Sequence, residues 1–164
     1  MKKWSPLKKG DIVDLVAPGS ACSQEELKKS VQKLKQMGYV PRVPKSFFSG
    51  HQLFSNTDAK RFEVLKKALY AKDSQGIWCV RGGYGSLRLL PLLSRLKKPA
   101  RSKFVLGYSD ITTIHHFLNT RWGWPTLHGP LFDRLGNGKM SKMQTLELEN
   151  ILTGKTKKIQ FKNL

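Results

Sequence analysis

The sequence predicts one α/β domain with a mostly parallel, five-stranded sheet and helices on both faces, which is the three-layer, doubly wound arrangement. Short apolar runs alternate with helical patterns along the chain, and this alternation is typical of parallel strands joined by right-handed crossovers. A length of 164 residues suffices for a single core, and an apolar fraction of 39% argues against disorder. Glycine-containing turns follow two of the apolar runs, as expected where a buried strand gives way to a helix.

The first half of the chain is predicted to hold two strands and two helices. An apolar run from Ile12 to Val16 predicts the first strand, and Tyr39 to Val43 predicts the second. The helix between them has a capping box, apolar residues at helical spacing and a terminal glycine: Ser23 with Glu26, then Leu27, Val31 and Leu34, then Gly38. Another helix is predicted after the second strand, where Phe62, Leu65 and Leu69 share one face.

The second half continues the alternation. Strands are predicted at Ile77 to Val80, at Phe104 to Leu106 and near Thr126-Leu127. Helices are predicted from Leu87 to Leu96, from Ser109 through Ile111, Ile114, Phe117 and Leu118, and around Met143 to Leu152. After the last helix, Ile159-Gln160-Phe161 alternates apolar and polar residues like the start of a further strand.

The formal charge of +19 is spread along the chain. Basic residues occur on predicted helices and in a loop, at Lys28, Lys29, Lys33, Lys35, Lys66, Lys67, Lys97, Lys98, Arg101 and Lys103. Spread charge is typical of a solvated surface, whereas a nucleic-acid interface combines a basic stripe with exposed aromatic residues, and Phe62, Trp78 and Phe104 fall at core-like positions. General solvation is therefore favoured over nucleic-acid binding, although such a field attracts polyanions and also suits an acidic partner or a carboxylate-bearing substrate.

The two cysteines, Cys22 and Cys79, have neither disulfide nor zinc spacing. Cys79 is expected in the core, and Cys22, in a polar loop, has the alternative of an exposed thiol with no nearby base. No cofactor or metal is expected. The amino terminus lacks an apolar stretch and no later run reaches membrane-spanning length, so we expect a soluble, cytoplasmic protein.

Two glycine-containing turns carry most of the chemical information. Arg81-Gly82-Gly83-Tyr84-Gly85 follows the third strand, and Gly107-Tyr108-Ser109-Asp110 follows the fourth. Both are expected at the carboxyl edge of the sheet, where ligands bind in open α/β folds. The amides of the first turn precede a helix, so this turn is suited to binding an anion. The alternative is an ordinary glycine-rich turn without a ligand. Ser109 stands where a nucleophile elbow would place it, or it caps the helix that follows.

Four segments together resemble the LD-carboxypeptidases, a serine peptidase family that includes the microcin immunity peptidases. They are Gly10-Asp11-Ile12-Val13 leading to Val16-Ala17-Pro18, Cys79 to Leu90, Leu106 to Thr112, and His128-Gly129-Pro130. The segments cover nearly the whole chain in order. The resemblance implies a flavodoxin-like or class I glutamine amidotransferase-like fold, with Ser109 as the nucleophile and the backbone amides of Gly83 and Asp110 as the oxyanion hole.

The resemblance also implies a substrate. Members of the family release a terminal D-amino acid, D-alanine, from the murein tetrapeptide during cell-wall recycling, through an acyl-enzyme and without a metal or cofactor. Arg81, Tyr84 and His128 are the expected substrate-binding residues, and Arg81 has the alternative role of bracing its turn. The Asp110 carboxylate is expected to cap its own helix. Family enzymes are commonly homodimers.

One departure from the family is large, because the histidine base and its glutamate belong to a second domain with no counterpart in this chain. A serine hydroxyl without a base is a poor nucleophile, so we expect the isolated chain to be inactive. Among the local histidines, His115 and His116 are expected out of reach and His51 lacks an orienting partner. His128 is the local candidate base, with pocket shaping as the favoured alternative.

We therefore expect residues 1–152 to form the nucleophile-bearing domain and residues 153–164 to begin a linker or strand toward an absent carboxyl-terminal domain. The chain is then a piece of a longer enzyme or a naturally short protein. Two alternatives remain, namely a non-catalytic module that binds peptides and a charge-driven binder of nucleic acid or another polyanion.

Overall fold

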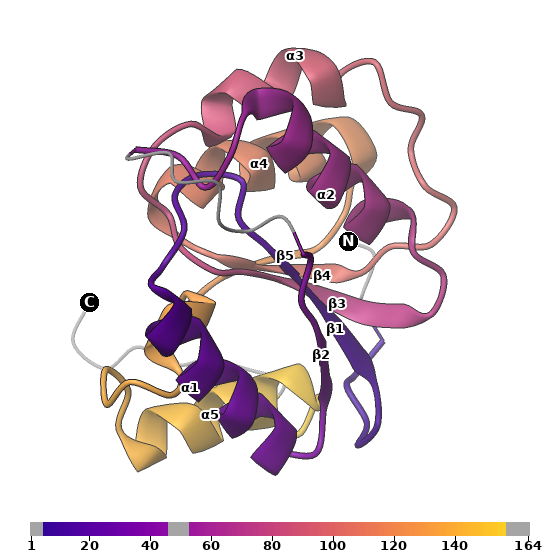
Figure 1. Cartoon of the computed structure of the whole chain (residues 1–164). Coiled ribbons are helices and arrows are strands. Elements are labelled where there is room, and N and C mark those ends of the chain that lie inside the picture. The colour runs from indigo at the N-terminus through magenta and orange to yellow at the C-terminus, as the bar shows by residue number, and fades with distance from the viewer. Residues whose placement is uncertain (1–4, 46–52, 157–164) are drawn as a thin grey trace, which may run out of the picture.

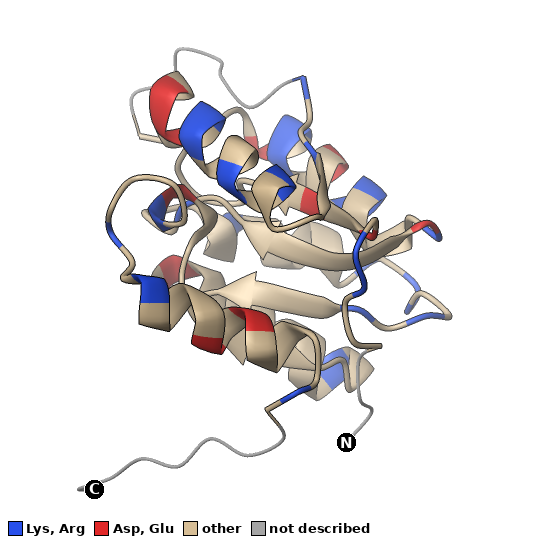
Figure 2. Ribbon diagram, turned by 90° about the horizontal axis from the view of Figure 1, so that it is seen from below, with Lys and Arg blue, Asp and Glu red and all other residues tan. Residues whose placement is uncertain are grey.

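A computed structural model describes residues 5–45 and 53–156, which form an all-parallel, five-stranded sheet between two helical layers (Figure 1). The strands are β1 (Ile12–Val16), β2 (Val40–Arg42), β3 (Ser74–Cys79), β4 (Phe104–Gly107) and β5 (Thr126–His128), in the spatial order β2-β1-β3-β4-β5. Helices α1 (Gln24–Gln36) and α5 (Lys142–Leu152) cover one face, and α2 (Asp58–Tyr70), α3 (Leu90–Leu93) and α4 (Thr112–Phe117) cover the other (Figures 1 and 2). The predicted three-layer α/β fold is confirmed.

Each face of the sheet carries its own apolar layer. Along β3, Trp78 packs toward α1 and α5, while Ile77 and Cys79 pack toward α2 and α4. Successive strand residues point to opposite faces, so a continuous apolar run is what a sheet covered on both sides requires. Cys79 lies in the core as expected.

The predicted signals for α1 are confirmed. The Ser23 hydroxyl accepts a hydrogen bond from the Glu26 amide at 3.1 Å, and the Glu26 carboxylate accepts one from the Ser23 amide at 2.9 Å, which completes the capping box. Gly38, just past the helix, has a φ of +84°. The chain then turns directly into β2, whose position at the sheet edge accommodates Pro41.

Strand β3 begins three residues earlier than the apolar run indicates. Gly76 lies inside the strand, and a Cβ there would overlap the ring of Phe104 on the neighbouring strand. The glycine therefore makes room for an aromatic side chain instead of marking a turn. Because a glycine within a strand usually weakens it, the sequence alone favoured the later start.

The helix predicted from Leu87 to Leu96 is shorter and mixed. A 3₁₀ turn, η1 (Ser86–Leu89), precedes the single turn of α3, with Pro91 in its first positions. Proline lacks the amide that a continuous helix would use, so the regular pattern restarts around it. After β4, the 3₁₀ turn η2 (Ser109–Ile111), α4 and the π-helical segment η3 (Leu118–Trp122) follow one another, ending at Gly123.

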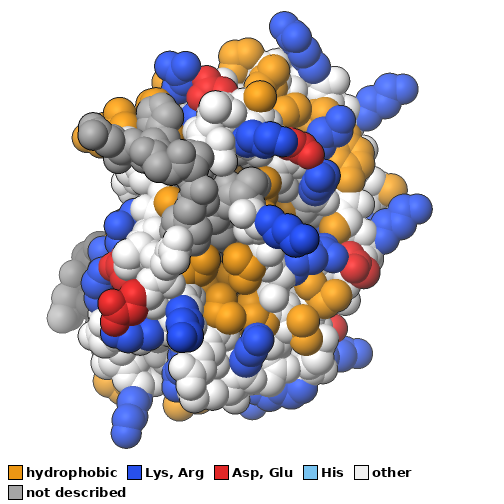
Figure 3. Space-filling model, in the orientation of Figure 1, with side chains coloured by type: hydrophobic (Ala, Val, Ile, Leu, Met, Phe, Trp, Pro, Cys, Tyr) orange, Lys and Arg blue, Asp and Glu red, His pale blue; other side chains and the backbone are white. Residues whose placement is uncertain are grey.

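Basic residues occur on helices and loops of both layers (Figure 2), and on the face seen in Figure 3 their side chains are scattered instead of forming one stripe. Lys103 is an exception to the expected solvated surface, because it is 1% exposed. Its Nζ donates to the Ala68 carbonyl at 2.6 Å and to the Ser74 hydroxyl at 2.7 Å, and it lies 3.8 Å from the Asp14 carboxylate. These acceptors replace the water that burial removes.

Within residues 5–45 and 53–156, we find no helix with the length and apolar character needed to span a bilayer. The strand predicted at Ile159-Gln160-Phe161 lies outside the described residues.

Candidate active site

Ser109 begins η2, two residues after β4 ends. Its φ is +63°, the left-handed region, and it is the one non-glycine residue there among those that the structure describes. An L-residue pays a steric cost in this conformation, and strained turns of this kind are common at functional sites. The residue is exposed, and no side-chain cap hydrogen bond forms at η2. The structure therefore shows a sharp strand-to-helix turn at Ser109, and among the described residues we find no hydrogen bond by which the Ser109 hydroxyl caps the helix.

The glycine-rich turn lies against Ser109. A Cβ added at Gly82 would stand 3.2 Å from the Ser109 Cβ and 3.5 Å from its Oγ. Gly83 has a φ of +79°, and a Cβ there would overlap the Ser20 hydroxyl. Within the described parts of the chain, the Gly83 and Asp110 amides donate no backbone hydrogen bond of the turn or loop type. Among the described residues, both N–H groups thus lack a loop carbonyl as a partner, and both lie near the turn that carries the hydroxyl.

The Asp110 carboxylate joins these two turns. Its Oδ2 accepts a hydrogen bond from the Ser86 amide at 2.9 Å, so it caps η1 after the glycine-rich turn. The expectation that it caps its own helix is wrong, because the side chain crosses to the neighbouring strand's turn. The carboxylate thus fixes the glycine-rich turn relative to Ser109.

Two further loops hold the glycine-rich turn from its other side. The Ser20 amide donates to the Gly82 carbonyl at 2.9 Å, and the Ser20 hydroxyl donates to the Leu53 carbonyl at 2.7 Å. The Ser55 amide donates to the Gly19 carbonyl at 3.0 Å. Loops after β1, before α2 and after β3 are therefore connected through their backbones.

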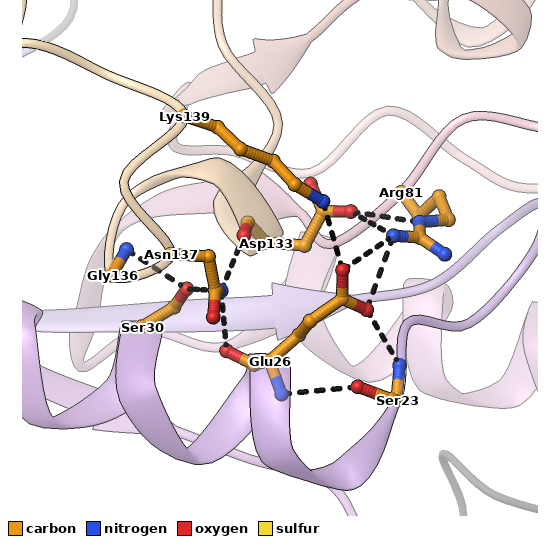
Figure 4. A network of polar contacts seen from close by, with 8 residues as sticks. All are labelled: Ser23, Glu26, Ser30, Arg81, Asp133, Gly136, Asn137 and Lys139. Carbon is orange, nitrogen blue, oxygen red and sulfur yellow. Dashed lines mark hydrogen bonds and ion pairs between the residues drawn. The ribbon is translucent and has the colours of Figure 1, made fainter.

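Arg81 is held between two carboxylates (Figure 4). Its Nε lies 2.7 Å from Asp133 Oδ2, and its Nη2 lies 3.1 Å and 3.2 Å from the two oxygens of Glu26. Asp133 is buried. Glu26 also pairs with Lys139 at 2.9 Å, and hydrogen bonds from Lys139 and the Ser23 backbone lower the pKa of Glu26 to about 2. These contacts support the bracing role for Arg81, since its charge is already matched.

The same network ties α1 to the loop that contains η4 (Phe132–Arg134). The Asn137 amide group donates to the Glu26 carbonyl at 3.0 Å and to the Asp133 carbonyl at 2.7 Å (Figure 4). The Ser30 hydroxyl accepts from Asn137 at 3.3 Å and from the Gly136 amide at 3.2 Å. Sequence reasoning missed Asp133 and Asn137, because each also binds a residue more than fifty positions away, and no local pattern marks such a contact.

A pocket of about 440 Å³ opens next to Tyr108, the residue before Ser109. Its apolar lining comes from Leu106, Leu127, Pro130, Met140, Leu148 and Ile151. Its polar lining includes His128, Arg134, Lys139, Gln144 and Glu147. His128 pairs in register with Gly107 and its ring lies 6.0 Å from that of Tyr108, so it stands at the rim as expected. Tyr84 is 68% exposed on the glycine-rich turn.

The histidines and cysteines of the described residues form no hydrogen bond with Ser109. His115 is buried, which lowers its pKa to about 4 and keeps it neutral at pH 7. Cys22 is buried as well, and that burial raises the pKa of its thiol to about 11. The alternative of an exposed Cys22 thiol is therefore wrong. His51 lies outside the described residues.

Comparisons with known proteins show the family to which the chain belongs. A family model described as the LD-carboxypeptidase N-terminal domain matches residues 13–129. The chain is 31% identical over 139 residues to the murein tetrapeptide carboxypeptidase of Pseudomonas aeruginosa, covering 84% of this chain and 44% of that protein. A Rickettsia prowazekii protein that bears a carboxypeptidase name is 38% identical over 139 residues, which are 83% of this chain and 44% of that protein.

The solved structures show the same fold. An MccF-like protein from Bacillus anthracis superposes with a TM-score of 0.80 at 27% identity, over 92% of this chain and 46% of that one. The muramoyltetrapeptide carboxypeptidase of Oxalobacter formigenes superposes with a TM-score of 0.70 at 22% identity, over 87% of this chain and 48% of that one. The chain therefore spans less than half the length of these proteins.

Proposed function

Because the chain belongs to the LD-carboxypeptidase family, we propose that it is the nucleophile-bearing, amino-terminal half of a serine LD-carboxypeptidase. The whole enzyme would release terminal D-alanine from the murein tetrapeptide in cytoplasmic cell-wall recycling. Residues 1–152 form the nucleophile domain of this proposal, and residues 153–164 lead toward a second domain. Homodimer formation belongs to the same proposal.

The observation that carries the proposal is the turn at Ser109. Ser109 is exposed on a left-handed turn, and Gly82 lies so close to it that a Cβ added at this glycine would stand 3.5 Å from the Ser109 Oγ. A hydroxyl in a sharp strand-to-helix turn, with backbone amides beside it, is what acyl transfer requires.

The proposed reaction proceeds in two halves. A base takes the Ser109 proton, Oγ bonds to the carbonyl carbon, and the amides of Gly83 and Asp110 stabilise the oxyanion. The C–N bond then breaks, and the proton passes to the amine of D-alanine. Water, deprotonated by the same base, hydrolyses the acyl-enzyme and restores Ser109. The base and its glutamate would come from the second domain, while Tyr84 and His128 contact the peptide at the rim.

The test is a chimera with a matched variant. This chain would be fused to the remaining part of the Pseudomonas aeruginosa relative and incubated with murein tetrapeptide, and free D-alanine would be measured. We expect release by the chimera, none by its Ser109→Ala variant, and none above background by the chain alone. Undiminished release by Ser109→Ala would eliminate Ser109 as the nucleophile.

A second function, a module that binds peptides without cleaving them, is favoured by one observation. No histidine or carboxylate is hydrogen-bonded to Ser109 among the described residues, while a pocket of about 440 Å³ opens at Tyr108, the residue before it. Tetrapeptide binding with no D-alanine release from either the chain or the chimera would support this alternative.

A further inference from the structure

Arg134 differs from the other cations around the site. Arg81 and Lys139 both pair with Glu26, and Arg81 also pairs with Asp133. The Arg134 guanidinium, in contrast, has neither an ion pair nor a hydrogen bond to any residue within 5–45 and 53–156, and its Cζ lies over the Tyr108 ring at 5.6 Å from the centroid. The ring restrains the guanidinium by a cation–π contact without neutralising its charge.

The Arg134 guanidinium lies at a pocket near the candidate active site. Arg134 lines the pocket of about 440 Å³ that begins at Tyr108, next to Ser109 in the chain. This volume lies in the range of small-ligand sites, which combine apolar walls with a few polar groups. The lining side chains with formal charge are Arg134, Lys139 and Glu147. Since Lys139 is paired with Glu26, Arg134 is the cation left to meet a ligand.

We propose that Arg134 binds a carboxylate of the peptide substrate, whose aliphatic part packs on the apolar floor formed by Leu106, Leu127 and Leu148. The inference rests on the proposed function and specifies its substrate class, a short peptide with a free carboxylate near the scissile bond. A guanidinium offers a planar fork of donors that matches a carboxylate, and such charge-assisted bonds are the stronger ones. Restraint by Tyr108 reduces the freedom lost on binding.

The inference assigns recognition to Arg134 in place of Arg81. Both arginines lie near the rim, but a carboxylate that bound Arg81 would have to compete with the carboxylates of Glu26 and Asp133. Arg134 has no such competitor among the residues that the structure describes. Glu147, also in the lining, is exposed on α5 and repels a second carboxylate, which restricts where the peptide's acidic group binds.

Binding of murein tetrapeptide to the isolated chain, measured by calorimetry, tests the inference without catalysis. Against wild type, we expect Arg134→Ala to weaken binding about tenfold or more and Arg134→Lys to weaken it less, because lysine keeps the charge but loses the fork. The matched control is Arg121→Ala, an exposed arginine of η3 outside the pocket lining. A tetrapeptide with its carboxylates amidated should bind wild type and Arg134→Ala equally weakly.

Equal affinity of wild type and Arg134→Ala for the acidic peptide would overturn the inference, and so would an absence of binding by wild type. Thermal unfolding of each variant checks that its fold is intact, and Arg134→Met, which keeps the stem, provides a second uncharged variant. The outcomes separate from those of the proposed function. If the peptide binds in an Arg134-dependent manner but the chimera releases no D-alanine, only the proposed enzymatic function is refuted. If the chimera releases D-alanine equally well with and without Arg134, only the proposed role of Arg134 is refuted.

Discussion

Arg81 Nε lies 2.7 Å from Asp133 Oδ2, and this contact joins the glycine-rich turn to a loop fifty-two positions further along the chain. Asp133 is 4% exposed and its amide also donates to the Val80 carbonyl at 3.2 Å. The pair therefore anchors the start of the turn that approaches Ser109. The carboxylate is the buried partner of this ion pair, so removing the arginine should lower the stability of the fold most, because it leaves that carboxylate unpaired.

Arg81→Met should lower the free energy of unfolding by about 3 kcal/mol, because it leaves a buried carboxylate without its cation. Arg88→Met is the matched control, since Arg88 is 61% exposed in its pair with Asp58, and exposed pairs contribute at most about 1 kcal/mol. Urea denaturation of both variants measures the two losses. Equal, small losses would show that the Arg81 pair is no anchor.

Gly83→Ala should lower the free energy of unfolding by more than the positive φ of Gly83 alone explains. The left-handed conformation costs an alanine about 1–2 kcal/mol, and the added Cβ also overlaps the Ser20 hydroxyl. Gly138→Ala isolates the first cost, because Gly138 has a φ of +67° and open space around it. Urea denaturation should show the larger loss for Gly83→Ala, and combining it with Ser20→Gly should recover part of the difference.

Ser109→Gly should stabilise the chain by up to about 1 kcal/mol, because glycine adopts a φ of +63° without steric cost. Ser109→Ala, which keeps a Cβ, should not. Thr112→Gly, in the first turn of α4, is the control in which glycine should destabilise the helix, by about 0.3 kcal/mol. A Ser109→Gly protein that melts below wild type would contradict the assignment of strain to this turn.

Lys103 should make stability rise with pH above 8. Burial lowers its pKa in the folded state to about 8, whereas in the unfolded chain it stays near the ordinary value of about 10.4. Between these values the unfolded state binds more protons, so the free energy of unfolding increases with pH, by up to about 3 kcal/mol in total.

Lys103→Met removes this titration and serves as the reference. Urea denaturation at pH 7.5, 9 and 10.5 should show the wild type gaining stability relative to the variant across this range. A constant difference between the two proteins would mean that Lys103 titrates normally when buried against Ala68 and Ser74.

The sequence was sufficient for the layers of the fold and for most elements, because burial on both faces imposes apolar runs and helical spacing. The sequence was insufficient at positions where the same residue type is compatible with two different local structures. Gly76 looks like a turn but accommodates Phe104 inside β3, and Pro91 interrupts a leucine-rich pattern that otherwise indicates one helix. Lysine is typical of the surface, and Lys103 is buried only because the fold brings the Ala68 carbonyl, the Ser74 hydroxyl and the Asp14 carboxylate to its ammonium group.

The residues of the candidate site were likewise predictable from the sequence only in part. Ser109 and the glycine-rich turn were predictable because their positions follow strands of a parallel sheet, whose carboxyl ends share one edge. The pairing of Arg81 with Asp133 was not, since an ion pair across the chain leaves no periodic trace. The free guanidinium of Arg134 was invisible for the same reason, because only the fold reveals which cations lack partners.

The hydrogen bonds that the Ser20 amide and hydroxyl donate to Gly82 and Leu53 have a practical consequence. These three residues lie within the first hundred positions, but the Asp110 and Asp133 carboxylates that hold the same glycine-rich turn come from later in the chain. A protein engineer who transplants the site therefore needs to carry over the three connected loops, the serine turn and the loop with Asp133, and is free to choose the polypeptide that delivers the proton acceptor.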